Sequence, residues 1–140
     1  VVICAAAVAD WGLIPEGNKY KELGINNKIK KTKKTLMFKT IQNADIISEI
    51  AKSKIRPKLI IGFSAETENV VQNAKDKLIA KDIDLIIAND VSENKVFGKD
   101  VNKVYVIDKK NCEEWIEQSK KSIAFKISDK INEILLLNSS

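Results

Sequence analysis

Leu59-Ile60-Ile61-Gly62-Phe63 and Asp84-Leu85-Ile86-Ile87-Ala88 are the two stretches that decide the fold of this chain. Each is a continuous apolar run rather than an alternation, which is typical of a strand buried on both faces of a parallel sheet. Between them, residues 66–81 begin with acidic side chains and end with lysines, an arrangement that suits a helix dipole. The order strand, helix, strand predicts a βαβ unit.

Further predicted strands and helices lie on both sides of this unit in the sequence. Residues 1–5 form another apolar run, and residues 104–107 predict a fourth strand. A helix is expected to start at residues 43–45 and to end at Arg56-Pro57, because the residue before a proline avoids the α region. Ser119 is expected to cap a last helix, whereas residues 112–118 fit no single assignment.

These elements predict an α/β fold with a Rossmann-like, doubly wound and mostly parallel sheet. We expect residues 1–140 to form a single nucleotide-binding α/β domain. Because residue 1 already lies inside a strand-like run, we expect an N-terminal βαβ part of that domain to be missing. Residues 11–40 hold three of the glycines and several asparagines, and they are too long for a simple connection. They are interpreted as a lid or a dimerisation arm.

Composition narrows the classes of function. The chain has 24 Lys+Arg against 19 Asp+Glu, but Arg56 is its only arginine and aromatic residues make up 6%. Nucleic-acid readers rely on arginine and aromatic stacking, so we expect a phosphate-bearing small ligand, or only a lysine-rich composition, rather than nucleic acid. Apolar runs are too short to span a membrane. The absence of histidine excludes a Ser-His-Asp triad and histidine metal ligands. Cys4 and Cys112 lack metal-site spacing, which favours a reduced, cytoplasmic protein.

Three predicted strand ends carry unusual residues, and ligands of doubly wound sheets bind beyond such ends. Ala7 and Asp10 follow the first strand, Phe63 precedes a helix N-terminus, and Asn89 with Asp90 follows the third strand. Asp10 suits a ribose hydroxyl or Mg²⁺, and Phe63 suits a base. Each also has a plainer interpretation: a solvated carboxylate, a core aromatic ring and an Asn-Asp turn.

Lysines supply the charges for a phosphate ligand. Lys28 belongs to a cluster on the long loop, where a mobile backbone would let it close over a charged ligand. Lys77 and Lys81 are four residues apart and so share one helix face. A solvated basic surface is the alternative for each group.

Taken in order, these segments resemble phosphopantothenoylcysteine synthetase, the phosphopantothenate–cysteine ligase that often forms the C-terminal part of a fused bacterial decarboxylase/ligase. The resemblance covers residues 1 to about 108. The segments that carry it are Ala6-Ala7-Val8-Ala9-Asp10-Trp11, Lys28-Ile29-Lys30-Lys31, Asn43-Ala44-Asp45-Ile46, Gly62-Phe63-Ser64-Ala65-Glu66-Thr67-Glu68, Lys77-Leu78 with Lys81, Asp84-Leu85-Ile86-Ile87-Ala88-Asn89-Asp90-Val91-Ser92, and Phe97 with Asp100 and Asn102. Ser64 stands where the family usually has alanine.

The resemblance implies a ligase of coenzyme A biosynthesis that joins 4′-phosphopantothenate to L-cysteine, with CTP or ATP as co-substrate and Mg²⁺ as cofactor. It implies a homodimer that is fused or associated with a flavin-dependent decarboxylase. It assigns catalytic roles to Lys28, Asn89 and Asp90. It assigns the nucleotide to Ala7, Asp10, Lys28, Phe63, Lys77 and Lys81, and the metal to Asp10. A non-catalytic nucleotide-binding or regulatory module, and a nicotinamide-dependent enzyme, are the alternatives.

Overall fold

The computed structural model of the protein describes residues 1–15, 37–92 and 100–137. The chain divides into two compact units, one of residues 1–6 with 46–140 and one of residues 7–45. The larger unit holds a five-stranded sheet and the smaller unit a two-stranded sheet.

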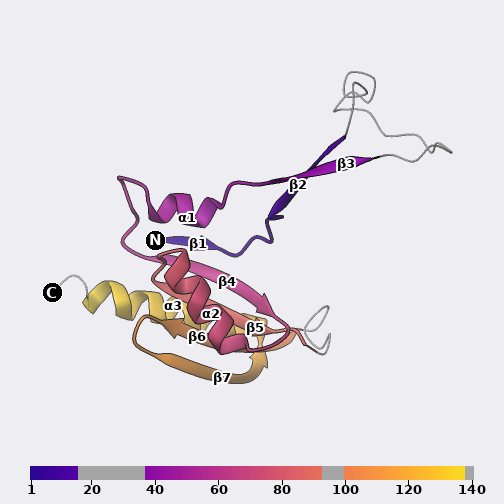
Figure 1. Ribbon diagram of the computed structural model, residues 1–140. Helices are drawn as coiled ribbons and strands as arrows, with labels where there is room; N and C mark the ends of the chain where they lie inside the picture. The colour runs from indigo at the N-terminus through magenta and orange to yellow at the C-terminus, as the bar shows by residue number, and fades with distance from the viewer. Residues whose placement is uncertain (16–36, 93–99, 138–140) are drawn as a thin grey trace. The chain divides into compact units, whose positions relative to one another are not determined.

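The larger sheet has the strand order β1-β4-β5-β6-β7. Its first three members are β1 (Val2–Cys4), β4 (Ile60–Glu66) and β5 (Leu85–Asp90), which run parallel to one another. Helix α2 (Val70–Ala80) connects β4 to β5 (Figure 1). The continuous apolar runs of β4 and β5 are almost wholly buried, so the predicted βαβ unit is confirmed.

The other two strands make the sheet mixed rather than all parallel. β6 (Val101–Asp108) runs antiparallel to β5, and β7 (Cys112–Ser119) runs antiparallel to β6. β7 is the stretch for which the sequence allowed no assignment. The link between β6 and β7 is too short for the crossover that a parallel pair needs, so the two strands form a hairpin. Asp108 closes that turn by accepting hydrogen bonds from the backbone N–H groups of Lys110 and Asn111, at 2.6 and 2.7 Å.

Two apolar cores lie on opposite faces of this sheet. On one face, α2 and the short α1 (Ile46–Ala51) cover a cluster that includes Leu78 and Ile86. On the other face, α3 (Lys120–Leu137) packs through Ile123 and Ile127. The helices therefore cover both faces, as a doubly wound α/β fold requires (Figure 1).

The helix boundaries differ in part from those predicted. Glu66, expected in the first turn of a helix, is the last residue of β4, and α2 begins only after Asn69 in the left-handed region at φ 47°. α1 ends at Ala51, before the expected stop at Arg56-Pro57. The cap of α3 is confirmed, since Ser119 Oγ accepts a hydrogen bond from Ser122 N at 3.0 Å. No helix in the described ranges has the length and apolar character needed to cross a membrane.

Arg56 fastens the two central strands at their starts. Its Nη1 and Nη2 each lie 3.1 Å from a carboxylate oxygen of Asp84. Asp84 Oδ2 also accepts a hydrogen bond from Ile60 N at 2.8 Å. The hydrogen bond to Asp84 raises the pKa of Arg56, although burial opposes it. This forked pair holds the starts of β4 and β5 together.

The smaller unit is a β-hairpin. β2 (Trp11–Pro15) pairs antiparallel with β3 (Phe38–Gln42), in the region interpreted from the sequence as a lid or a dimerisation arm. Asn43 closes its base: the side-chain Nδ2 donates to Ala9 O and the backbone N to Asp10 O, both at 2.8 Å.

Candidate functional site

The candidate site lies at the edge where β4 and β5 both end. Because the strands are parallel, their carboxyl ends meet, and Glu66 pairs in register with Asp90 there. The chain turns into α2 after β4, and β6 begins beside the end of β5. Ligands of open α/β sheets bind beyond this edge.

Glu66 and Lys77 form an ion pair on the α2 side of the edge. Glu66 is 7% exposed, and its Oε1 lies 2.6 Å from Lys77 Nζ, whose side chain is 46% exposed. Helical side chains lean toward the helix N-terminus, so Lys77 reaches back to the strand end. Lys81, one turn further along α2, is half-buried. Of the two predicted phosphate-binding lysines, Lys77 is thus held at the edge by a carboxylate.

The N-terminus of α2 lies at the same edge, since α2 follows β4 along the chain. Asn69, its N-cap residue, makes no side-chain cap hydrogen bond. The first-turn N–H groups of a helix have no partner within the helix and favour negative charge. A helix start of this kind suits a phosphate group.

Phe63 and Asn89 lie on the opposite, α3-side face of the two strands. Side chains alternate between faces along a strand, and Phe63 pairs in register with the buried Ile87 of the α3-side core, as Ala65 pairs with Asn89. Phe63 is 36% exposed, so its ring is only partly used in packing. The structure thus brings Phe63 and Asn89 to one face, and Lys77 and Asp90 to the other.

Asn89 belongs to a chain of amide hydrogen bonds. Its Oδ1 accepts from Asn102 Nδ2 at 2.6 Å, and its Nδ2 donates to Ser64 O at 3.2 Å. Asn102 is 8% exposed. Two asparagine side chains and the backbone carbonyl of Ser64 therefore link three neighbouring strands at the edge where the apolar core ends.

Asp90 has the contacts of a turn residue. Its Oδ1 accepts hydrogen bonds from Ser92 N at 3.0 Å and from Ser92 Oγ at 2.7 Å. This is the Asn-Asp turn that the sequence offered as the plainer interpretation. Asp90 is nevertheless exposed at the strand end.

Gly62 packs against the core rather than opening space for a ligand. A Cβ at this position would lie 2.8 Å from Ile83 Cδ1 and 3.1 Å from Ile47 Cδ1. The missing side chain therefore lets α1 and the start of β5 approach β4.

The remaining predicted residues fall elsewhere. Ala7 and Asp10 are exposed in the smaller unit, just before its hairpin. Lys28 lies outside the described residues. Across the described part of the chain, no group of three or more His, Cys, Asp or Glu side chains is placed to hold a metal ion. Mg²⁺ often uses one or two carboxylates with substrate phosphates, so a single exposed carboxylate such as Asp10 fits that mode.

Sequence reasoning gave no role to two residues of this edge, Glu66 and Asn102. Glu66 was interpreted as part of a helix start, where an acidic residue is common. An acidic residue directly after the apolar run of β4 was the signal that could have placed it at the strand end. Asn102 is a polar residue just before the apolar residues of β6, which was a weak signal.

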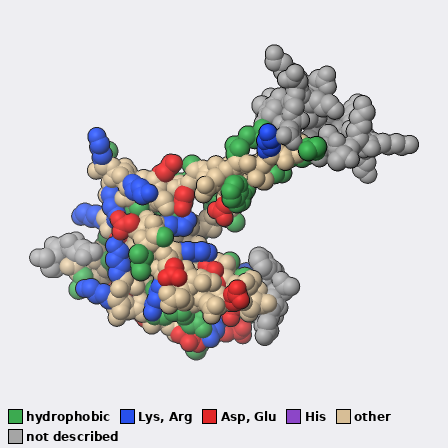
Figure 2. All heavy atoms as spheres, in the orientation of Figure 1, with side chains coloured by type: hydrophobic (Ala, Val, Ile, Leu, Met, Phe, Trp, Pro, Cys, Tyr) green, Lys and Arg blue, Asp and Glu red, His purple; other side chains and the backbone are tan. Residues whose placement is uncertain are grey.

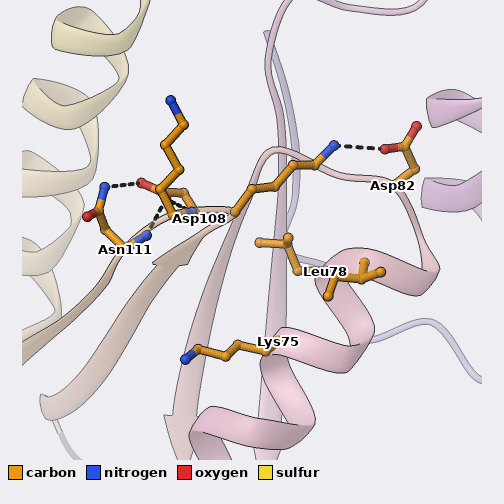
Figure 3. Close-up of a pocket in the computed structure, with 8 residues that line it drawn as sticks. Lys75, Leu78, Asp82, Asp108 and Asn111 are labelled. Carbon is orange, nitrogen blue, oxygen red and sulfur yellow. Dashed lines mark hydrogen bonds and ion pairs between the residues drawn. The ribbon is translucent and has the colours of Figure 1, made fainter.

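A hollow of about 490 Å³ lies at the opposite edge of the sheet, between α2 and the β6–β7 turn (Figure 3). Lys75 and Leu78 line it from α2, and Asp108 and Asn111 line it from the turn. Asp82 and Lys109 pair across its rim at 3.0 Å, and this hydrogen bond lowers the pKa of Asp82. These charged side chains already serve the ion pair and the turn.

The visible face of the larger unit mixes both signs of charge (Figure 2).

Comparison with known proteins gives one family. The family model for the DNA/pantothenate metabolism flavoprotein C-terminal domain matches residues 1–135. The coenzyme A biosynthesis bifunctional protein CoaBC of Borreliella burgdorferi is 42% identical over 129 residues, which are 91% of this chain and 30% of that protein. The chain spans about a third of the length of the curated relatives it matches, at 30% and 31% for two of them.

Solved structures agree with the fold. The crystal structure of the C-terminal domain of CoaBC matches with a TM-score of 0.58 at 29% identity, over 74% of this chain and 46% of that one. The DNA/pantothenate metabolism flavoprotein from Streptococcus pneumoniae matches with a TM-score of 0.64 at 22% identity, over 91% of this chain and 57% of that one. The second match extends the shared α/β fold over most of the chain.

Proposed function

The chain belongs to the family of DNA/pantothenate metabolism flavoprotein C-terminal domains, and we propose from this premise that it is part of a phosphopantothenate–cysteine ligase. The reaction belongs to coenzyme A biosynthesis, which the names of its relatives state for those proteins. The activity is proposed for the full-length protein. A flavin-dependent decarboxylase, fused or associated, and a homodimer belong to the same proposal.

The observation that carries the proposal is the edge of β4 and β5. There, an uncapped helix N-terminus and Lys77 lie on one side, and a part-exposed Phe63 and Asn89 lie on the other. A nucleoside triphosphate needs charge for its phosphates and an aromatic ring for its base, and this edge offers the first on one face of the strands and the second on the other.

The proposed chemistry has two steps. A carboxylate oxygen of 4′-phosphopantothenate attacks the α-phosphorus of CTP, the bond to the β-phosphate breaks, and pyrophosphate leaves. The cysteine amine then attacks the acyl carbon, the acyl–oxygen bond breaks with CMP as leaving group, and the amine loses a proton. Stabilising negative charge dominates both steps, and it requires no histidine.

The residues have separate roles in this proposal. Phe63 stacks on the base, and the N–H groups of α2 with Lys77 and Lys81 face the phosphates. Asn89 faces the reacting carboxyl group. Ala7, Asp10 and Lys28 keep the roles that the resemblance implies. Mg²⁺, when bound, would neutralise phosphate charge, with Asp10 as its carboxylate ligand.

Pyrophosphate release by the full-length protein tests the function. With CTP, 4′-phosphopantothenate and L-cysteine together we expect release, and omission of 4′-phosphopantothenate should abolish it. We expect CTP to bind more tightly than ATP in calorimetric titration. Nucleotide binding without any pyrophosphate release would instead support a non-catalytic nucleotide-binding module.

A further inference from the structure

The hydrogen bonds that link β4, β5 and β6 at this edge allow only one orientation of the Asn89 side-chain amide. Asn102 Nδ2 donates to Asn89 Oδ1 at 2.6 Å, and Asn89 Nδ2 donates to Ser64 O at 3.2 Å. Turning the Asn89 amide over would set two N–H donors against each other at Asn102 and two oxygens against each other at Ser64. The neighbours therefore decide which way the Asn89 amide points.

This orientation leaves one N–H of Asn89 for a ligand. The Asn89 Nδ2 carries two protons, and one is used on Ser64 O. Asn89 is half-buried at the end of β5, where it pairs in register with Ala65 and shares a face with the part-exposed Phe63, two residues further back on β4. A second N–H at this edge is placed to donate to an oxygen of a bound molecule.

The strand around Asn102 is regular. The pairing of β6 with β7 shifts register between Asn102 and Val104, but the extra residue lies on β7, because the two steps along β6 face three steps along β7 from Gln118 to Trp115. Asn102 therefore shares the α3-side face with Val104 by the ordinary alternation of a strand, and it is buried there although its neighbour Val101 is exposed.

Stability alone does not account for Asn102. Its Oδ1 is buried and has no hydrogen-bond partner among the described residues. A buried acceptor without a partner costs stability, which an apolar side chain of similar size would avoid. What Asn102 contributes in return is the hydrogen bond that fixes Asn89.

We propose that Asn102 is a positioning residue that locks the Asn89 amide with one N–H directed at the acyl oxygen of the substrate. This inference rests on the proposed ligase function and adds to it a residue and a role. Asn102 itself touches no substrate. It acts through Asn89, whose N–H stabilises the oxygen on which negative charge grows as the amine attacks the acyl carbon.

A double-mutant cycle in the full-length protein tests the proposal. Asn102→Leu removes the donor, and Asn102→Asp replaces it with an acceptor that favours the reversed Asn89 amide. Both should lower kcat by on the order of tenfold to a hundredfold, with the KM for CTP nearly unchanged. In an Asn89→Ala background, Asn102→Leu should lower kcat no further, because the Asn89 amide through which Asn102 acts is absent.

Val104→Ala is the matched control, because Val104 is buried on the same strand and the same face. It should lower the melting temperature while kcat stays near that of the wild type. If the double variant lost kcat by the product of the losses in Asn89→Ala and Asn102→Leu, the positioning role of Asn102 would be wrong. An unchanged kcat in Asn102→Asp would also show that it is wrong. Neither result would contradict the proposed ligase function. A wild-type protein that releases no pyrophosphate would overturn the proposed function and this inference together.

Discussion

Lys77 Nζ lies 2.6 Å from Oε1 of Glu66, and this ion pair ties the last turn of helix α2 to the last residue of strand β4. The two partners are unequal, since the Glu66 side chain is 9% exposed and the Lys77 side chain 46%. Glu66 is therefore a desolvated carboxylate whose compensating charge comes from a lysine that solvent and ligand can both reach. This asymmetry makes Lys77 important for stability as well as for the proposed phosphate site.

Replacing Lys77 should show how much the stability of the protein depends on this ion pair. Lys77→Met leaves the buried carboxylate unpaired, so we expect the free energy of unfolding to fall by about 1–3 kcal/mol, less than for a fully buried pair because Lys77 is half in solvent. Urea unfolding measures it. Lys75→Met, an exposed lysine of the same helix, should change stability by less than about 0.5 kcal/mol. Equal losses at both positions would contradict the structural role of the pair.

Gly62 gives a second prediction, because its absent side chain is a packing requirement. Gly62→Ala would place a methyl group 2.8 Å from Ile83 Cδ1 and 3.1 Å from Ile47 Cδ1. We expect a loss of about 1–3 kcal/mol in the free energy of unfolding from overpacking. Ala65→Ser, at an exposed position of the same strand, should be nearly neutral. An unchanged melting temperature in Gly62→Ala would show that the two isoleucines move aside easily.

The parallel core of the fold could be predicted from the sequence, because residues 59–63 and 84–88 are apolar without alternation. The direction of β6 could not be, since an apolar strand pairs equally well in either direction, and the short β6–β7 turn decides it. β7 escaped assignment because its polar pattern is that of an edge strand, with one face in solvent. Glu66 was misplaced because a helix-start signal overlapped a strand end.

The position of the candidate site could be predicted from the sequence, but the contacts between its side chains could not. The sequence selected the strand ends that bear Phe63, Asn89 and Asp90, since such ends meet at one edge of a parallel sheet. It could not show that Lys77 has a buried carboxylate partner, or that Asn102 bonds to Asn89. Those contacts depend on side chains brought together by pleat and register, which no local pattern encodes.

The hydrogen bond from Lys130 to Glu113 joins α3 to β7 and should make stability depend on pH. The hydrogen bond from Lys130, and then that from Trp115, lowers the pKa of Glu113 below its ordinary 4.5. Its contribution is present above the unfolded pKa and is lost as the pH falls through the folded pKa. The same hydrogen bond raises the pKa of Lys130, whose contribution is present below its ordinary 10.5 and is lost as the pH rises through the folded pKa.

Glu113→Gln should therefore flatten the acid side of the stability curve. At neutral pH we expect it to cost less than about 1 kcal/mol, because the pair is partly exposed and solvent screens it. The difference from the wild type should shrink as the pH falls from 4.5 through the lowered folded pKa of Glu113, where the wild-type carboxylate protonates. Chemical unfolding across that range provides the curve. Glu117→Gln, at an exposed position on the same strand, should run parallel to the wild type, and a constant offset in Glu113→Gln would refute the assignment.

Phe63 offers the sharpest test of the proposed nucleotide site, because its two interpretations predict different losses. If the ring stacks on a base, Phe63→Ala should weaken nucleotide binding by about tenfold to a hundredfold, which corresponds to the ~1–3 kcal/mol of one base–aromatic stack. If the ring is only a core residue, truncation should lower the melting temperature and leave binding intact. An exposure of 36% means that part of the ring is free to meet a ligand.

Calorimetric titration of CTP, run beside thermal unfolding of the full-length protein, separates the two interpretations. Phe63→Tyr should keep most of the affinity, because a phenol ring stacks as well as a phenyl ring. Phe125→Ala is the matched control, since Phe125 is 64% exposed on α3 and has no role in the proposal. It should change neither binding nor stability by much. Equal, small changes in CTP affinity at Phe63 and Phe125 would remove the base from this face of β4, and the nucleotide would then have to be sought beside Lys77 and the α2 N-terminus alone.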